Sequence, residues 1–305
     1  MSYEPDFKLG VSVYSYTGDF GVVMDLEDCA EDIADLGATG IEILGEGHVL
    51  GYPEPSSAWV DWWHGTVERL GLTPTLYGSW LDTRRHVDRS MTVEEGTAQL
   101  ALDLDLASRM GFSFVRPKIG VVTGDLVPDP IWAEVVERNL DRAHDAGIVI
   151  CPEIHWPTPI RSQAVDDYLA LIERTGTTNF GLLIDTGVFQ LGHHHRSEPG
   201  LRSQLGKGDV PAFPTPPVVP VNDLREVMDH VVYFQAKFHE IDDNLVDHHI
   251  PWTEILEVVA EAGYTGWLSS EYEGDRLPYK ASDQLRRQHA LIRTLAAKSL
   301  VLGGR

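Results

Sequence analysis

The stretch VICPEIHWPTP (residues 149–159) is a run of strand-forming residues that ends in two ionisable side chains, Glu153 and His155. Seven further β-rich segments occur along the chain, and most are continuous apolar runs, as expected of strands that are covered on both faces. The eight expected strands span residues 8–16, 40–44, 73–78, 112–117, 147–154, 180–185, 231–238 and 267–272.

The segments between these strands carry helix signals. Thr92 and Glu95 have the spacing of a capping box, and Pro130 is suited to the first turn of a helix over 131–146. Glycines stand where several helices should end, and a left-handed residue is needed there. These are Gly37, Gly71, Gly111, Gly147, Gly176 and Gly263.

Regular alternation of strand and helix predicts an α/β fold, a single (β/α)₈ TIM barrel over residues 1–305. A doubly wound open sheet is the alternative, but no Gly-x-Gly-x-x-Gly turn follows the first strand. The sixth and seventh strands are separated by a long insertion, residues 190–220, rich in Gly and Pro. We expect a lid or a partner-binding loop there; a loose surface insertion is the alternative.

Composition narrows the class of protein. The 305 residues are 43% hydrophobic and carry a formal net charge of −23, so a nucleic-acid partner is not expected. No apolar run approaches the ~20 residues needed to cross a bilayer, and the N-terminus lacks signal-peptide features. We therefore expect a cytoplasmic protein without a membrane partner. Cys29 and Cys151 are expected to be buried thiols.

Ionisable residues recur where the last four strands end. In a TIM barrel the chemistry lies at the carboxyl ends of the strands, and residues two apart on a strand share a face. Strand 5 ends with Glu153 and His155, and strand 6 with Asp185. Strand 7 ends with Gln235, Lys237 and His239, and strand 8 with Glu271.

Three carboxylates at one barrel mouth would repel each other without a cation. The sequence therefore predicts a divalent metal bound by Glu153, Asp185 and Glu271, with Gln235 as a neutral fourth ligand. Oxygen ligands without thiolate favour Mn²⁺, with Mg²⁺ and Co²⁺ as alternatives. Each carboxylate taken alone is equally compatible with a helix cap or a solvated rim residue.

The chain resembles the xylose-isomerase-like barrels, which include sugar-phosphate isomerases, ketose 3-epimerases, inosose dehydratases and apurinic endonucleases. The resemblance rests on CPEIH (151–155), LLIDTG (182–187) and SSEYEG (269–274). It departs from the family pattern at Gln235, where a histidine is usual, and at Val188, where the endonucleases have another histidine. The resemblance therefore implies a metal-dependent sugar enzyme rather than a nuclease.

A narrower resemblance rests on FQAKFHEIDDNL (234–245), HIPWTEI (249–255) and LSSEYEG (268–274). These stretches are similar to the catalytic α subunits of bacterial C-glycoside deglycosidases. That similarity implies bound Mn²⁺, a 3-keto C-glycoside substrate that loses its aglycone by β-elimination, and a small β subunit as partner. A ketose 3-epimerase, a sugar isomerase and an inosose dehydratase are the alternatives, and a barrel that binds sugar without converting it is a further one.

Enolisation next to a carbonyl is the step that all these enzymes share, and it requires a base. His155 is the first candidate, since it lies beside a metal ligand and has an ordinary pKa near 6.5; it is otherwise a residue that only orients a ligand. Glu153 and Glu271 are the alternative bases. Lys237 is a candidate for binding a substrate oxygen, and His239 for protonating the leaving group.

Aromatic side chains near the strand ends suit a sugar or a flat aglycone. The expected substrate-binding residues are Tyr14, Tyr16, Glu42, Trp80, Arg116 and Trp156. Arg116 and Glu42 end strands 4 and 2, where they are candidates for an oxyanion or a hydroxyl, and a structural ion pair is the alternative.

Overall fold

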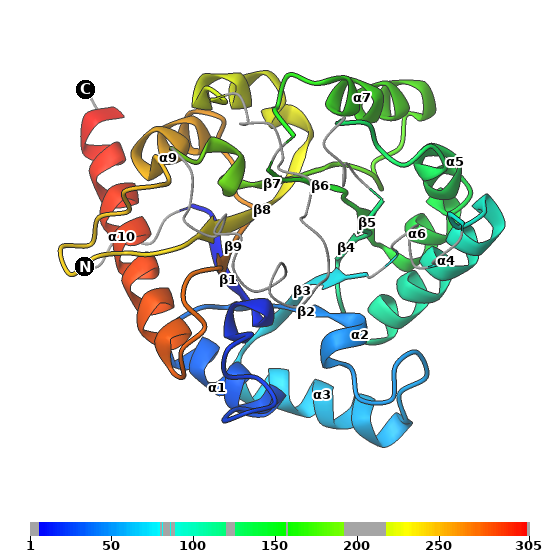
Figure 1. The fold of residues 1–305 in the computed structure, drawn as a ribbon, viewed down its shortest axis with the longest axis horizontal. Helices are drawn as coiled ribbons and strands as arrows, with labels where there is room; N and C mark the ends of the chain where they lie inside the picture. Colours follow the sequence, from blue (N-terminus) through cyan, green and yellow to red (C-terminus); the bar gives the residue numbers. More distant parts are fainter. Residues whose placement is uncertain are drawn as a thin grey trace, which may run out of the picture.

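The computed structural model describes residues 6–79, 81, 86, 89–119, 126–156, 158–191 and 218–303. Parallel strands curl into a barrel with the helices around it, as Figure 1 shows. The strands are β1 (Lys8–Ser12), β2 (Gly40–Leu44), β3 (Thr73–Gly78), β4 (Phe114–Arg116), β5 (Val149–Ile150), β6 (Glu153–Ile154), β7 (Leu182–Asp185), β8 (Val231–Phe238) and β9 (Trp267–Tyr272). This confirms the predicted TIM barrel.

Helices cover the outside of the strands. They are α1 (Leu26–Asp35), α2 (Gly45–His48), α3 (Ser57–Leu70), α4 (Val93–Arg109), α5 (Trp132–Glu137), α6 (Leu140–Ala146), α7 (Gln163–Thr175), α9 (Trp252–Glu261) and α10 (Lys280–Gly303). Short 3₁₀ helices follow some strands or precede β8: η1 (Val13–Tyr16), η2 (Thr186–Phe189), η4 (Val221–Glu226) and η5 (Met228–His230). No helix among the described residues is long and apolar enough to span a bilayer.

The first and last strands pair in parallel, with Lys8 opposite Trp267, and so join the two ends of the chain. The remaining neighbours follow the order β5-β4-β3-β2-β1-β9-β8-β7-β6. Near-continuous apolar residues on these strands form the core between the barrel and the helices.

The expected fifth strand is broken into β5 and β6. Pro152 stands in the break and has no N–H to donate to a neighbouring strand. Its carbonyl still accepts from Leu183 N at 3.3 Å, and Ile150 forms an isolated bridge with Phe180. β5 therefore pairs with β4, while β6 pairs with β7 and starts at Glu153.

The helix signals hold at most positions. Thr92 and Glu95 form the predicted capping box of α4, and the six predicted glycines all have positive φ. The predicted helix over 131–146 is instead divided into α5 and α6. Asn139 donates from Nδ2 to the Val135 carbonyl at 2.9 Å, so its side chain competes with the backbone ladder where the helix is interrupted.

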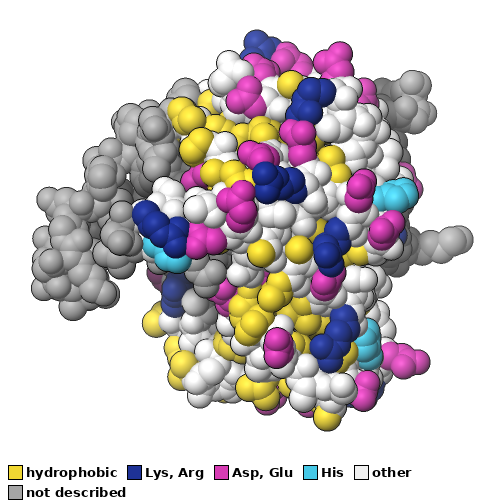
Figure 2. Space-filling view, turned by 90° about the vertical axis from the view of Figure 1, so that its right-hand side faces the viewer, with side chains coloured by type: hydrophobic (Ala, Val, Ile, Leu, Met, Phe, Trp, Pro, Cys, Tyr) yellow, Lys and Arg dark blue, Asp and Glu magenta, His cyan; other side chains and the backbone are white. Residues whose placement is uncertain are grey.

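The predicted insertion, residues 190–220, falls mostly outside the described residues, so its role as a lid or partner-binding loop stays a prediction. The outer face that carries α4, α5 and α6 shows acidic and basic side chains interspersed (Figure 2). Ion pairs on these helices join Arg142 to Asp105 and Arg138 to Glu134. The excess acid charge is therefore partly balanced on this face.

Helix α10 holds a buried histidine that should make folding sensitive to acid. His289 is 1% exposed, and its Nε2 lies 3.0 Å from Ser270 Oγ on β9. Burial lowers the pKa of His289 from 6.5 to about 3. Between these values the unfolded chain takes up a proton that the folded chain does not, so stability falls as the pH drops through this range.

We expect each pH unit below 6.5 to cost about 1.4 kcal/mol of unfolding free energy through this residue. Urea unfolding at pH 7.5 and pH 5 should therefore show a larger loss for the wild type than for His289→Gln, by about 2 kcal/mol. Equal losses in the two proteins would contradict the assignment, because all other titrating groups are common to both.

Candidate metal centre at the barrel mouth

A cluster of three carboxylates lies at the carboxyl ends of the strands. Glu153 begins β6, Asp185 ends β7, and Glu271 lies near the end of β9. One ligand oxygen from each lies within 4.8 Å of the others. Asp185 is fully buried and Glu271 is 3% exposed, so water screens their mutual repulsion poorly. The structure thus brings together the three acids that the sequence predicted as ligands.

The ammonium of Lys237 on β8 lies among these carboxylates. Its Nζ is 2.6 Å from Asp185 Oδ2 and 3.3 Å from Glu271 Oε2. A fourth carboxylate, Glu273, lies 3.6 Å away on the other side. One ammonium therefore partly neutralises three acids, and the cluster keeps an excess of negative charge.

The pKa values of the three cluster carboxyl groups shift in opposite directions. Burial raises the pKa of Asp185 and of Glu271 despite the opposing charge of Lys237. Burial alone would raise the pKa of Glu153 too, but Arg116 reverses the effect and holds it below its ordinary value. Burial would lower the pKa of Lys237, but Asp185 and Glu271 raise it well above its usual range. Burial therefore disfavours the charged forms of Asp185 and Glu271, while Arg116 favours the charged form of Glu153.

Gln235 lies on β8 beside this cluster and is fully buried. Its Nε2 donates to Glu271 Oε1 at 2.7 Å and to Glu42 Oε1 at 2.9 Å. Its Oε1 is buried and has no hydrogen-bond partner among the described residues. Apart from the ammonium of Lys237, the same holds for Asp185 Oδ2 and Glu271 Oε2. These buried oxygens fit a divalent cation that prefers oxygen ligands.

Arg116 and Glu42 lie beside and beneath the cluster. Arg116 Nη1 is 3.4 Å from Glu153 Oε2, which is the structural ion pair left open by the sequence. Burial would lower the pKa of Arg116, but Glu153 and Glu42 raise it. Glu42 is fully buried, and burial raises its pKa to about 7. In the structure it accepts from Gln235 and Tyr233, and its predicted substrate contact stays a prediction.

The two candidate histidines differ in their surroundings. His155 Nδ1 lies 2.5 Å from the Trp156 carbonyl, which can only accept, so Nδ1 carries a proton; in the neutral imidazole Nε2 then holds the lone pair. His239 is 7% exposed, with Nδ1 3.2 Å from the Glu273 carbonyl and Nε2 3.3 Å from Gln190 Oε1. Burial lowers the pKa of His239. Geometry therefore suits His155 to accept a proton.

Among the predicted aromatic residues, the structure brings one side chain towards the cluster and turns another away. Tyr14 is half-buried, and its pKa is raised by burial and by the charges of Glu273 and Glu271. Tyr16 is fully buried and donates to Asp32 on α1 at 2.8 Å, so it does not reach the mouth. Trp156 is half-buried next to His155. Trp80 lies outside the described residues.

Two residues of the site were missed in the sequence. Glu273 pairs with Lys237, and Tyr233 donates to Glu42 Oε2 at 3.3 Å. Strand alternation could have found both, because Glu273 comes two residues after Glu271 and Tyr233 comes two before Gln235.

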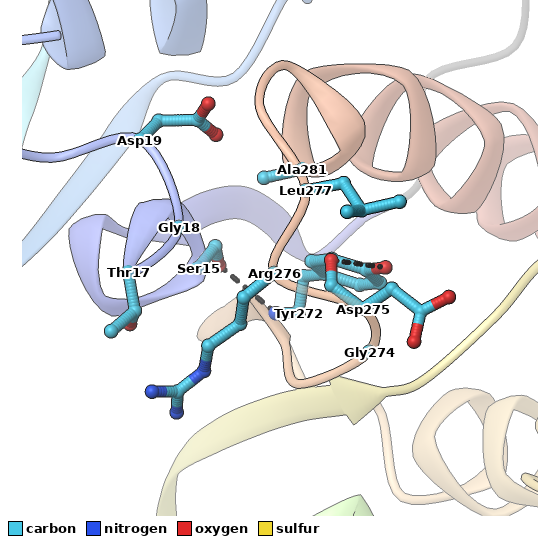
Figure 3. Close-up of a pocket in the computed structure, with 10 residues that line it drawn as sticks. All are labelled: Ser15, Thr17, Gly18, Asp19, Tyr272, Gly274, Asp275, Arg276, Leu277 and Ala281. Atoms are coloured by element: carbon cyan, nitrogen blue, oxygen red, sulfur yellow. Dashed lines mark hydrogen bonds between the residues drawn. The ribbon is translucent and has the colours of Figure 1, made fainter. Parts of the chain in front are cut away.

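A small hollow lies at the rim where the turn after η1 meets the segment after β9 (Figure 3). Ser15 Oγ accepts from Tyr272 N at 2.9 Å on its floor, and Arg276 lies alongside. Its volume of about 10 Å³ is at the lower limit for one water molecule. A sugar does not fit there.

Comparison with known proteins finds a family with the same fold and relatives that are named for an activity. The sequence pattern of the xylose isomerase-like TIM barrel family matches residues 30–295. The chain is 25% identical to a C-glycoside deglycosidase alpha subunit of Arthrobacter globiformis, over 94% of this chain and 91% of that protein. It is also 25% identical to a 3'-dehydrocarminate deglycosidase alpha subunit of Microbacterium sp., over 88% of each. A solved L-ribulose 3-epimerase has a TM-score of 0.65 at 15% identity, covering 98% of this chain and 97% of its own.

Proposed function

This chain belongs to the xylose isomerase-like TIM barrel family, and from that premise we propose that it cleaves C-glycosides by enolisation. Its substrate would be a 3-keto C-glycoside, from which β-elimination releases the aglycone. The observation that carries this proposal is the buried Glu153–Asp185–Glu271 cluster, in a chain whose near-full-length relatives are named deglycosidase alpha subunits. The name alpha subunit also supports a partner subunit, which we propose to be a small β subunit.

Glu153, Asp185, Glu271 and the Oε1 of Gln235 would hold a divalent cation, with Mn²⁺ proposed first and Mg²⁺ or Co²⁺ as alternatives. When bound, such an ion supplies Lewis-acid stabilisation to the negative charge that develops on a carbonyl oxygen. Arg116 keeps Glu153 ionised and so preserves a ligand charge.

His155 is proposed to take the proton from C2 of the sugar, next to the C3 carbonyl. The lone pair on Nε2 makes this possible, because Nδ1 is committed to the Trp156 carbonyl. A positioned base of this kind contributes about 10²–10⁴-fold to rate. The enolate then re-forms the C3 carbonyl, a C1=C2 double bond forms, and the bond from C1 to the aglycone breaks.

The aglycone carbon must gain a proton as it leaves. His155 can return the proton that it removed, so the step needs no outside acid; His239 is the second candidate for this task. Lys237 is proposed to donate a hydrogen bond to a substrate oxygen, which would draw it away from Asp185. Tyr14 and Trp156 would contact the sugar or the aglycone.

A ketose 3-epimerase is the second candidate function. It is favoured by the opposite pKa shifts of two carboxylates, since Arg116 lowers the pKa of Glu153 against the effect of burial while burial raises that of Glu271. Two acids that differ in proton affinity in this way could remove a proton from one face of a sugar and return it to the other.

The test uses protein isolated from the organism that makes it, so that any partner subunit is retained. We expect a 3-keto C-glycoside to release its aglycone, EDTA treatment to stop the release, and added Mn²⁺ to restore it. Proton NMR in D₂O follows both reactions. Aglycone release unaffected by chelation would refute the metal-dependent mechanism. Deuterium uptake by ketoses with no aglycone release would replace the first function with the second.

A further inference from the structure

A buried polar chain runs beneath the carboxylate cluster and ends on Gln235. Its amide nitrogen lies between two carboxylate oxygens, 2.9 Å from Glu42 Oε1 and 2.7 Å from Glu271 Oε1. Nε2 donates to both carboxylates, so the amide group that faces the two acids is the NH₂. The carbonyl Oε1 is thereby left over, buried and without a partner among the described residues.

We propose that Glu42 is a positioning residue that fixes the Gln235 amide so that Oε1, rather than Nε2, is presented as a metal ligand. This inference rests on the metal centre of the proposed function and deepens it. The opposite amide orientation would place Oε1 against two carboxylate oxygens and leave only an NH₂ group for a cation. An amide NH₂ offers no ligand atom, so the orientation decides whether Gln235 binds metal.

Glu271 alone cannot fix the orientation of the Gln235 amide. Its Oε1 meets the Gln235 amide, but its Oε2 faces Lys237 and belongs to the carboxylate cluster. Its charge is therefore shared with whatever cation the cluster holds. Glu42 lies outside the cluster and is fully buried, and its Oε1 accepts from Gln235 Nε2.

The position of Glu42 is itself fixed by Tyr233, which lies on the same strand as Gln235. Tyr233 on β8 donates to Glu42 Oε2 at 3.3 Å, and its hydroxyl lies 2.9 Å from Thr75 Oγ1 on β3. Thr75 Oγ1 is also 3.0 Å from the Ile41 carbonyl on β2. These contacts link β8, β3 and β2. They hold Glu42 Oε2, while Glu42 Oε1 accepts from Gln235.

Burying the carboxyl group of Glu42 costs desolvation free energy unless its hydrogen bonds offset that cost. Substitutions at position 42 can therefore test what those hydrogen bonds do. A residue that merely fills space could be replaced by leucine without effect on metal affinity. A positioning residue should tolerate glutamine, whose Oε1 can still accept from Gln235, but not leucine. Its effect should also vanish when Gln235 is absent.

The experiment is a double-mutant cycle that measures the Mn²⁺ dissociation constant by electron paramagnetic resonance. The proteins are the wild type, Glu42→Leu, Glu42→Gln, Gln235→Leu and the Glu42→Leu/Gln235→Leu double variant. We expect Glu42→Leu to weaken Mn²⁺ binding about 10–100-fold, as loss of a residue that orients a ligand does. Glu42→Gln should stay within about 3-fold of the wild type. In the Gln235→Leu background, Glu42→Leu should add no further loss.

Wild-type affinity in Glu42→Leu would overturn the inference, and so would an equal loss in Glu42→Gln or a full extra loss in the double variant. If Glu42→Leu does not fold, Tyr233→Phe keeps the volume and removes the donor to Glu42; it should weaken Mn²⁺ binding in the wild type but not in Gln235→Leu. A wild-type protein that binds no Mn²⁺ would refute the metal centre itself, which is a different failure.

Discussion

Glu153→Gln is expected to weaken divalent-metal binding at least about 100-fold and to lower aglycone release about 1,000-fold, while the barrel stays folded. The substitution removes one of three charged ligands from a site where water screens poorly. It keeps the side-chain shape, and the neutral amide can still accept from Arg116. Isothermal titration with Mn²⁺ measures the affinity, proton NMR measures aglycone release, and circular dichroism checks that the barrel is folded.

Glu273→Gln is the matched control for that loss. Glu273 lies 3.6 Å from Lys237 but does not belong to the three-carboxylate cluster. The same change there removes a nearby charge without removing a ligand, so Mn²⁺ affinity should change by less than about 5-fold. If both variants lose affinity equally, total charge rather than direct ligation governs binding. Unchanged affinity and turnover in Glu153→Gln would refute its role as a ligand.

Lys237→Met is expected to separate metal binding from catalysis. The ammonium pairs with two cluster carboxylates and repels a divalent cation, so its loss should leave Mn²⁺ affinity unchanged or raise it. Turnover should fall about 100–1,000-fold if Lys237 acts on a substrate oxygen. The metal-free variant should also melt at a lower temperature, because Asp185 loses its buried partner, and Mn²⁺ should raise that temperature more than in the wild type.

Lys8→Met provides the comparison for Lys237→Met. Lys8 starts β1 and lies over the Trp267 ring, at 5.3 Å from its centroid, at the end of the barrel away from the carboxylates. Its loss should change neither metal affinity nor turnover. Weaker Mn²⁺ binding together with normal turnover in Lys237→Met would contradict the assignment of Lys237.

Strand positions could be predicted closely because parallel strands of this barrel are continuous apolar runs. The predicted ranges 40–44, 73–78, 231–238 and 267–272 agree with β2, β3, β8 and β9. The fifth strand could not be drawn correctly from apolar character alone, because the break depends on a missing backbone donor at Pro152. The start of α10 could not be predicted from the sequence either. Tyr279, just before it, adopts a left-handed conformation although it is not a glycine.

The positions of candidate site residues could be predicted where these residues lie on regular strands. They could not be predicted where the residues lie outside the strands. Asp185, Gln235 and Glu271 lie within strands, so the alternation of faces brings them together. Tyr14 and Tyr16 were both expected near the barrel mouth, but both lie in η1, a 3₁₀ helix with three residues per turn. Residues two apart then point in different directions, and Tyr16 enters the core.

The pairing of β1 with β9 has a consequence for biosynthesis. Glu271 reaches its place only when the last strand inserts between β8 and β1, because its neighbours come from opposite ends of the chain. A nascent chain still lacking residues 267–272 would hold Glu153 and Asp185 without Glu271, so the proposed metal centre would stay incomplete until β9 has been synthesised. A translation product that stalls before β9 should therefore bind Mn²⁺ more weakly than the full chain.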